Sequence, residues 1–268
     1  MHNIAFKLIA MRCKVISFLP YVIIISLLFS CKKETNQTTE AETGVISGTV
    51  RLYDDKTNQL TNSSGVIVTV IGQSGKTATT GTDGRFRLEG LPFDNYDLSF
   101  SKTGYGTFKI FGVDHRKQPN TPSGTVSTTQ LSNVINLGAV SGSSVTSLNA
   151  LDYTYNEGPG IEYSYSIDPV PSTSNRGYIR TFLSKNYTIS STNYLAYSLT
   201  KSVLSNNTKG GFTNEELFAF GFNKGDSVYV KVYGDSFYSN DYTEPSTGQR
   251  VFPNLNSVSR DAVNFVIP

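Results

Sequence analysis

The alternation of apolar and polar residues divides the chain into three parts. Residues 15–29 are almost entirely apolar and follow a start that carries three basic residues and no acidic one. Residues 32–43 are rich in Lys, Glu, Thr, Asn and Gln and contain no large apolar side chain. From Val45 onward, apolar and polar residues alternate in short runs interrupted by Gly, Pro, Asn and Ser, a pattern typical of β-strands. The pattern therefore predicts a targeting segment, a flexible tether and an all-β body.

The first half of the body is predicted to consist of short strands joined by frequent turns. Its runs carry apolar residues at every second position or are rich in β-branched residues, as expected for strands with one buried face. Asp83-Gly84 is the strongest signal in the chain for a two-residue turn, so we expect residues 76–82 and 85–88 to pair as a hairpin. The predicted strands are residues 46–52, 66–71, 85–88, 96–100 and 126–140.

This half also contains a series of short motifs in a fixed order. They are Gly48-Thr49-Val50, Gly65 to Val70, Thr82-Asp83-Gly84-Arg85-Phe86, Leu91-Pro92, Tyr96-Asp97-Leu98 and Lys102-Thr103-Gly104-Tyr105. Over residues 45–112, these motifs resemble the carboxypeptidase regulatory-like domain, a transthyretin-type β-sandwich. Asn95 departs from the family's usual glycine, but asparagine also tolerates a left-handed turn. The resemblance implies a small accessory or spacer module without peptidase activity, because the zinc domain of the carboxypeptidases is missing.

The second half repeats the same short-strand pattern. Strands at this spacing predict a second β-sandwich with an immunoglobulin- or fibronectin-like topology. Thr213-Asn214-Glu215-Glu216 resembles a capping box and predicts one short helical turn. Gly142-Ser143-Ser144 marks the expected boundary between the two halves. The predicted strands are residues 145–155, 161–167, 177–184, 194–200, 227–234 and 262–267.

The apolar segment near the start ends at Leu28-Phe29-Ser30-Cys31, which resembles the lipobox of bacterial lipoproteins. A leucine three positions before the cysteine and a small residue directly before it match that pattern. The resemblance implies cleavage before Cys31 and acylation of this residue, and two or more acyl chains anchor a protein stably. One alternative is an uncleaved membrane anchor, although a bilayer needs ~20 apolar residues and this run is shorter. The other is that Cys31 is an incidental cysteine.

Removal of residues 1–30 changes the bulk properties of the chain. Three of the 23 Lys and Arg residues and none of the 21 Asp and Glu residues are lost, which leaves 20 basic against 21 acidic side chains. A nearly neutral chain gives no indication of a nucleic-acid partner. Cys13 is lost as well, so Cys31 is the only cysteine of the mature protein and no disulfide can form within its body.

The small number of histidine residues limits the catalytic chemistry that the chain can perform. His115 is the only histidine left after residue 30, and it stands in Asp114-His115-Arg116-Lys117. A Ser-His-Asp triad would need this residue, but its cationic neighbours disfavour a general base and no G-x-S-x-G motif occurs. A zinc site would have only carboxylates for its remaining ligands. We therefore expect an exposed loop histidine, no catalytic residue, no metal site and no cofactor.

The acidic residues allow two further site hypotheses. Asp54-Asp55 and Glu215-Glu216 are paired carboxylates of the kind that glycosidases use, but a turn and a helix start explain them better. Asp235 and the run Ser239-Asn240-Asp241 could offer oxygen atoms to calcium, although the spacing matches no EF-hand loop. We expect solvated turns and loops at all of these positions.

Tyrosine is the most notable excess in the composition. The mature chain keeps 15 of the 16 tyrosines and has no tryptophan. Tyr153 and Tyr155, and likewise Tyr163 and Tyr165, stand two positions apart, so each pair should share one face of a strand. Tyr163 and Tyr165 are therefore candidates for a ligand-binding platform that stacks on sugar rings or peptides. The alternative is a structural role, since tyrosine is a common strand residue.

The combined prediction is an all-β protein with two β-sandwich domains in tandem after a lipoprotein signal peptide and a flexible tether. We expect a non-enzymatic lipoprotein that serves structure, adhesion or assembly outside the cytoplasm, with the bilayer and an envelope protein or glycan as partners. Lys32-Lys33-Glu34 has no aspartate next to the cysteine, which favours the outer membrane. The alternatives are a glycan-binding accessory of a surface nutrient-uptake system and a hydrolase with an unrecognised site. The predicted segments are 1–30 (signal peptide), 31–44 (lipidated cysteine and tether), 45–141 (carboxypeptidase regulatory-like sandwich) and 142–268 (second sandwich).

Overall fold

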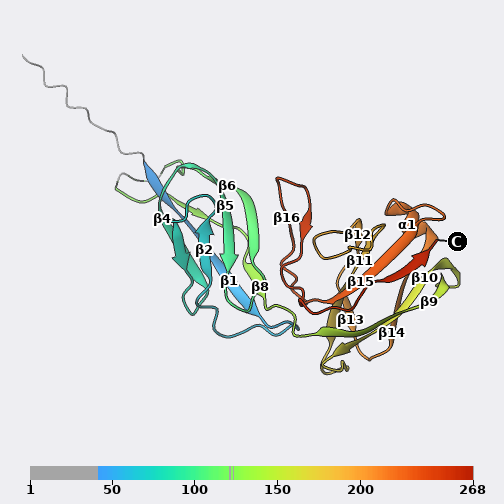
Figure 1. The fold of residues 1–268 in the computed structure, drawn as a ribbon. Helices are drawn as coiled ribbons and strands as arrows, with labels where there is room; N and C mark the ends of the chain where they lie inside the picture. Colours follow the sequence, from blue (N-terminus) through green and yellow to red (C-terminus); the bar gives the residue numbers. More distant parts are fainter. Residues whose placement is uncertain (1–41, 121, 123, 268) are drawn as a thin grey trace, which may run out of the picture. The chain divides into compact units, whose positions relative to one another are not determined.

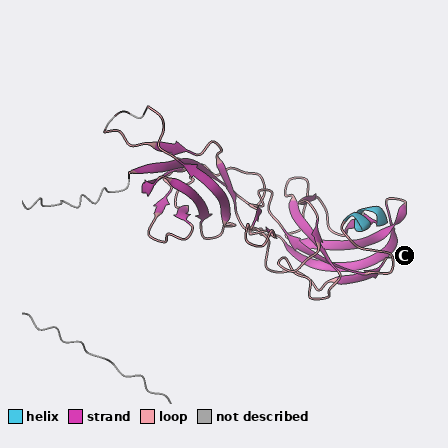
Figure 2. Ribbon diagram, turned by 90° about the horizontal axis from the view of Figure 1, so that it is seen from above, coloured by secondary structure: helices cyan, strands magenta, loops and turns pink. Residues whose placement is uncertain are grey.

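The computed structural model describes residues 42–120, 122 and 124–267, which belong to one compact unit, Ala41–Pro268. In this part of the chain helical structure is confined to α1 (Asn214–Ala219), and strands and loops form the rest (Figure 2). The expected all-β fold with two sandwiches is thereby confirmed. The predicted signal peptide, Cys31 and the tether up to residue 41 lie outside the described residues. None of the described segments is a helix of sufficient length and apolarity to cross a bilayer.

The first sandwich is made of two sheets that enclose one core (Figure 1). One sheet has the order β4-β1-β7, and β8 pairs with β1 beyond the end of β7; the other has the order β3-β2-β5-β6. β7 and β8 run parallel to β1, and the other pairs are antiparallel. The strands are β1 (Thr43–Tyr53), β2 (Ile67–Val70), β3 (Thr77–Thr79), β4 (Arg85–Pro92), β5 (Asp94–Ser101), β6 (Phe108–His115), β7 (Thr128–Gln130) and β8 (Ile135–Gly138).

Period-two alternation explains how these sheets meet. In β4, Phe86 and Leu88 are buried, whereas Arg85 and Arg87 on the opposite face are exposed. Phe86 packs edge to face on Phe100 of the facing sheet, with the ring centroids 5.7 Å apart. Burial of apolar side chains from both sheets stabilises the sandwich by about 1.5–3 kcal/mol for each large side chain.

The predicted hairpin at Asp83-Gly84 is wrong, because the turn joins strands of different sheets. β3 pairs with β2, whereas β4 pairs with β1. Gly84 has a φ of 76°, and a Cβ atom there would lie 1.9 Å from the carbonyl oxygen of Val50. A side chain is therefore excluded where the chain crosses between the sheets. The turn residues specify the local backbone geometry but not which strands pair.

The second sandwich also has two main sheets, with the orders β14-β10-β9 and β12-β11-β15-β18, and β13 pairs with β11. The predicted run 194–200 yields only β12, and four short strands were not predicted: β13, β14, β16 and β17. The capping box is confirmed, since the Thr213 hydroxyl accepts from Glu216 N at 3.2 Å while Thr213 N donates to the Glu216 carboxylate at 2.9 Å. The strands are β9 (Ser144–Tyr155), β10 (Gly158–Asp168), β11 (Gly177–Ser184), β12 (Ala196–Tyr197), β13 (Lys201–Val203), β14 (Thr208–Thr213), β15 (Ser227–Gly234), β16 (Tyr242–Thr243), β17 (Arg250–Val251) and β18 (Val263–Val266).

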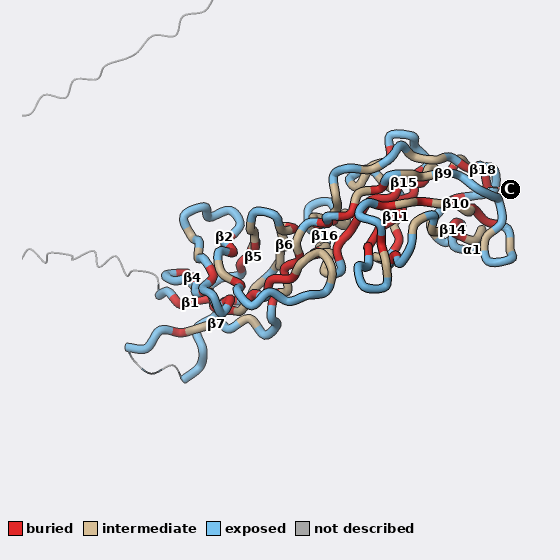
Figure 3. The backbone as a smooth tube through the Cα atoms, turned by 90° about the horizontal axis from the view of Figure 1, so that it is seen from below, coloured by how far each residue is buried: buried red, intermediate tan, exposed pale blue. Residues whose placement is uncertain are grey.

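Strand β11 is buried along its whole length, in contrast to the half-exposed β4 of the first sandwich (Figure 3). One face contributes Ile179 and Leu183 to the core between the two sheets. On the other face, Phe182 joins a second apolar cluster with Tyr233 of β15 and Phe252 from the segment that follows it. The loop region after β15 thus covers a sheet face that would otherwise be in water.

The two sandwiches are linked by hydrogen bonds around residues 138–141, which we call the joint. Asn254 is fully buried, and its amide donates to the carbonyl oxygens of Gly138 and Ala139 at 2.7 and 3.0 Å. Ser236 donates to the Ala139 carbonyl at 2.6 Å. A Cβ atom on Gly138 would lie 2.2 Å from the carbonyl oxygen of Tyr238, so the close approach of these backbones requires glycine.

Candidate functional site

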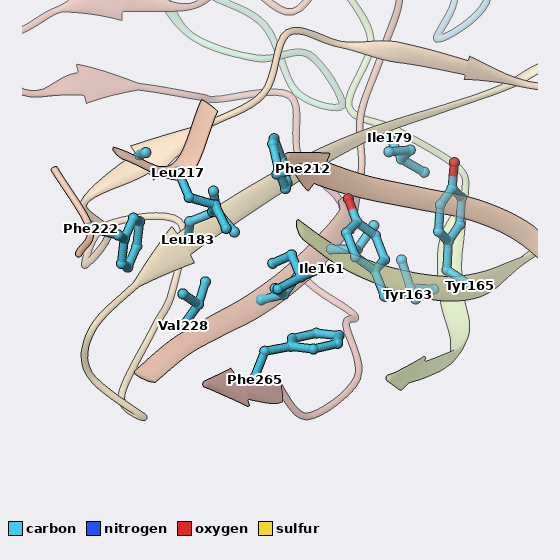
Figure 4. Packing of buried hydrophobic residues seen from close by; sticks show 14 of the residues in the cluster. Ile161, Tyr163, Tyr165, Ile179, Leu183, Phe212, Leu217, Phe222, Val228 and Phe265 are labelled. Carbon is cyan, nitrogen blue, oxygen red and sulfur yellow. The ribbon is translucent and has the colours of Figure 1, made fainter. Parts of the chain in front are cut away.

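The candidate ligand-binding residues Tyr163 and Tyr165 lie in the core of the second sandwich (Figure 4). Their side chains are only 1% and 3% exposed, and the Tyr163 hydroxyl lies 2.9 Å from the hydroxyl of Thr181. Burial raises the pKa of Tyr165 to about 12. Burial also raises the pKa of Tyr163, and the contact with Thr181 opposes only part of this effect. Their face of β10 is the inner one, so these candidates do not form an exposed stacking platform, and the burial fits the alternative of a structural role.

His115 is fully buried at the end of β6, so the expectation of an exposed loop histidine is also wrong. Its Nδ1 lies 2.8 Å from the Thr129 hydroxyl, and its ring lies against Phe93 with centroids 5.0 Å apart. Desolvation lowers the pKa of His115, while a contact with the Leu91 backbone opposes this effect. A Cβ atom on Gly44 would lie 2.8 Å from the ring, so the histidine fills the space beside the start of β1. Its environment is that of a neutral, packed side chain.

The two aspartates that could offer oxygen atoms to calcium are both paired with guanidinium groups, and the expected solvated loop is wrong for Asp235, which is buried. Asp235 is buried and accepts from Arg180 Nε at 2.9 Å and from the Thr200 hydroxyl at 2.8 Å. Asp241 accepts from Arg250 Nε at 2.9 Å. Each carboxylate thus already has a guanidinium as its counter-charge. Across the described residues, His, Cys, Asp and Glu do not come together in groups of three that could hold a metal ion.

A pocket of about 460 Å³ lies beside the joint, and we call it the joint pocket. Its size falls within the range of ~300–1,000 Å³ that is typical of small-molecule sites. Three segments line it: Phe108 and Ile110 from β6, residues 133–136 before and within β8, and residues 237–241 after β15. The pocket is therefore built from both sandwiches.

The polar side chains of the joint pocket are held in place by defined contacts. Asn240 accepts from Gly138 N through Oδ1 and donates to the Asn136 carbonyl through Nδ2, both at 2.7 Å. Desolvation acts to raise the pKa of Asp241, but hydrogen bonds from the Ser239 hydroxyl and from Arg250 outweigh it and hold this pKa below its usual range. The pocket thus presents an ionised carboxylate next to amide groups.

Sequence reasoning missed this pocket. It considered Ser239-Asn240-Asp241 only as cation ligands and did not weigh Phe237 at all. Phe237, which lines the pocket, is 47% exposed. The sequence signal was an aromatic pair, Phe237-Tyr238, placed directly before a polar run. The partner segment, residues 133–136, is more than 100 positions away and could not be connected to it by local pattern.

Residues 45–132 match the family model of the carboxypeptidase regulatory-like domain, which extends the resemblance beyond residue 112. The matched residues lie within the first sandwich. No curated protein matches the chain.

Several solved structures are similar to this chain at low sequence identity. A type II cohesin-X-dockerin complex from Acetivibrio cellulolyticus is 21% identical over 37% of this chain, with a TM-score of 0.28, and the chain spans 59% of that protein's length. A candidate carbohydrate binding protein from Bacteroides uniformis is 14% identical, with 84% of this chain and 100% of the other covered and a TM-score of 0.30. A DUF3823 family protein from Parabacteroides merdae is 12% identical, with 82% and 99% covered and a TM-score of 0.26.

Proposed function

We propose that this protein is a non-enzymatic accessory of the bacterial cell envelope, anchored in the outer membrane through acylated Cys31. The joint is the observation that carries the accessory role. Asn254, Ser236 and Asn240 connect the two sandwiches through buried side-chain hydrogen bonds to the backbone of residues 136–139. Buried polar networks of this kind fix one arrangement, because breaking them leaves polar groups without partners. A body built in this way suits a scaffold or recognition module carried on a tether.

Labelling with palmitate tests the anchor. The full chain expressed in a Gram-negative host is expected to incorporate labelled palmitate and to sediment with outer-membrane fractions. The Cys31→Ser variant is expected to lose the label and to appear in the soluble fraction, since one missing thiol removes the attachment site. A Cys13→Ser variant serves as the matched control and should keep the label. Membrane sedimentation of Cys31→Ser, or an unlabelled parent protein, would contradict the proposed anchor.

A second candidate function is glycan binding as part of a surface nutrient-uptake system. The specific observation in its favour is the joint pocket, which combines apolar faces with amide, hydroxyl and carboxylate groups. This combination is typical of sites for small polar ligands. The buried pair Tyr163 and Tyr165 takes no part in it.

A further inference from the structure

We infer that the joint pocket binds a neutral, hydroxyl-rich sugar ring. The inference rests on the glycan-binding candidate function and assigns to it a site and a class of ligand. A pyranose ring has an apolar face of C–H groups and a rim of hydroxyl groups. Its binding site must therefore offer an apolar surface and hydrogen-bonding groups side by side, and the joint pocket offers both.

The apolar part of the pocket includes Phe237. The ring is 47% exposed, and it packs on Tyr178 at a centroid distance of 5.6 Å and on Tyr238 at 5.0 Å. Both contacts are edge to face, the geometry that aromatic pairs prefer. Val134, 40% exposed, adds apolar surface from the segment before β8. A ring that is held by its neighbours while one side remains open is ready to stack on a ligand.

The charged and polar lining selects against anionic ligands. Asp241 is the only acidic residue of the lining, which contains no Glu, Lys, Arg or His. Its carboxylate is 26% exposed and is already stabilised in the ionised form by Ser239 and Arg250. An ionised carboxylate accepts hydrogen bonds from hydroxyl groups, and the lining offers no cationic side chain to phosphates, sulfates or uronic acids. The exposed amide of Asn133 supplies a donor and an acceptor on the opposite segment.

Asn240 fixes the distance between the two polar segments. Its side chain reaches from the 237–241 segment to Gly138 N and to the Asn136 carbonyl, so the two sides of the pocket cannot move apart without breaking both hydrogen bonds. Asn240 is only 8% exposed, so its side chain is buried among these partners and has little contact with solvent. A pocket that is already assembled loses less free energy on ordering when it binds a ligand.

Glycan arrays followed by titration calorimetry test the inference on the full chain purified in detergent. The array should contain neutral oligosaccharides and their sulfated or uronic-acid counterparts. We expect binding to neutral members, with Phe237→Ala weakening the affinity at least about tenfold, as truncation of a central aromatic contact does. Phe218→Ala is the matched control, because Phe218 is 46% exposed on α1 and does not line the pocket. Asn133→Ala should also weaken binding, whereas Asn149→Ala on β9 should not.

The outcomes distinguish failure of the proposed site from failure of the proposed function. Neutral glycan binding that Phe237→Ala and Asn133→Ala leave unchanged would overturn the site while glycan binding stands. Binding to acidic glycans alone would overturn the assigned ligand class. Binding to no glycan would overturn both the site and the glycan-binding candidate, and it would leave the palmitate-labelling test of the envelope anchor unaffected. Thermal melts of all four variants, matching the parent within a few degrees, verify that lost binding is not lost folding.

Discussion

The two sandwiches bury their strands in different ways. In the first, β4 keeps one face in water, and a single core between two sheets supports the fold. In the second, β11 is buried on both faces because residues after β15 fold back over the sheet. This second layer encloses Arg180 and Asp235, which form an ion pair at 2.9 Å. The comparison shows that a sandwich of ordinary strands can gain a second core, at the expense of having to satisfy charged groups inside it.

Breaking the buried ion pair is expected to give the largest effect. Arg180→Ala leaves Asp235 buried without its guanidinium and should lower the free energy of unfolding by about 3–5 kcal/mol. The double variant Arg180→Met, Asp235→Leu should be close to the parent, since it removes both charges together. Urea denaturation measures both. Arg87→Ala, which breaks an exposed pair with Glu89, is the control and should change stability by less than about 1 kcal/mol.

A core truncation in the first sandwich should have an effect of similar or slightly smaller size. Leu98 is fully buried between the sheets, and Leu98→Ala is expected to lower the free energy of unfolding by about 2–5 kcal/mol through lost burial and a cavity. Leu151→Ala on β9 is the matched control, because Leu151 is 47% exposed and forms little of the core. Equal destabilisation by the two variants in urea denaturation would contradict the assignment of Leu98 to a packed core.

Disruption of the joint should have a smaller effect on stability. Asn254→Ala removes the donor to the carbonyl oxygens of Gly138 and Ala139 and leaves these buried groups without it, at about 1–3 kcal/mol. Hydrogen exchange should show faster exchange around residues 138–143 while both cores stay protected. Asn206→Ala, which affects a side-chain bond to Ile167 N away from the joint, is the control. Uniformly faster exchange in both sandwiches would show that the joint is not a separate element.

Acid should weaken the first sandwich through His115. Its folded-state pKa is lowered by burial, so between that value and the unfolded value of about 6.5 the unfolded chain binds more protons. Stability is therefore complete above about pH 6.5 and falls as the pH decreases through and below this value. Thermal melts between pH 7.5 and pH 5 of the parent and of His115→Asn measure the difference. A parent curve parallel to that of the variant would contradict the expected titration.

Local pattern identified most strands but not their tertiary environment. Gly177–Ser184 and Ser227–Gly234 were predicted with their observed bounds, because their runs of apolar and β-branched residues are local. His115 was expected in an exposed loop, and Tyr163 and Tyr165 were candidates for an exposed platform, but all three are buried. Which face of a strand points inward depends on the facing sheet, and the sequence does not show how the segments after β15 cover β11. The joint pocket was missed for the same reason, because its sides come from segments more than 100 positions apart.

The joint also determines how this chain can be divided. Gly142-Ser143-Ser144 has the composition of a linker, yet Ser141 and Ser143 are buried, and Asn256 donates to the Ser141 carbonyl at 2.9 Å. Cleavage there would separate the second module from residues 138–141, whose backbone accepts hydrogen bonds from side chains in its loop of residues 235–256. It would also leave the end of the first module without the hydrogen bonds that this loop donates to it. Exchange of either module between proteins should therefore transfer the loop of residues 235–256 together with residues 138–143, so that the natural unit of recombination runs across the apparent boundary.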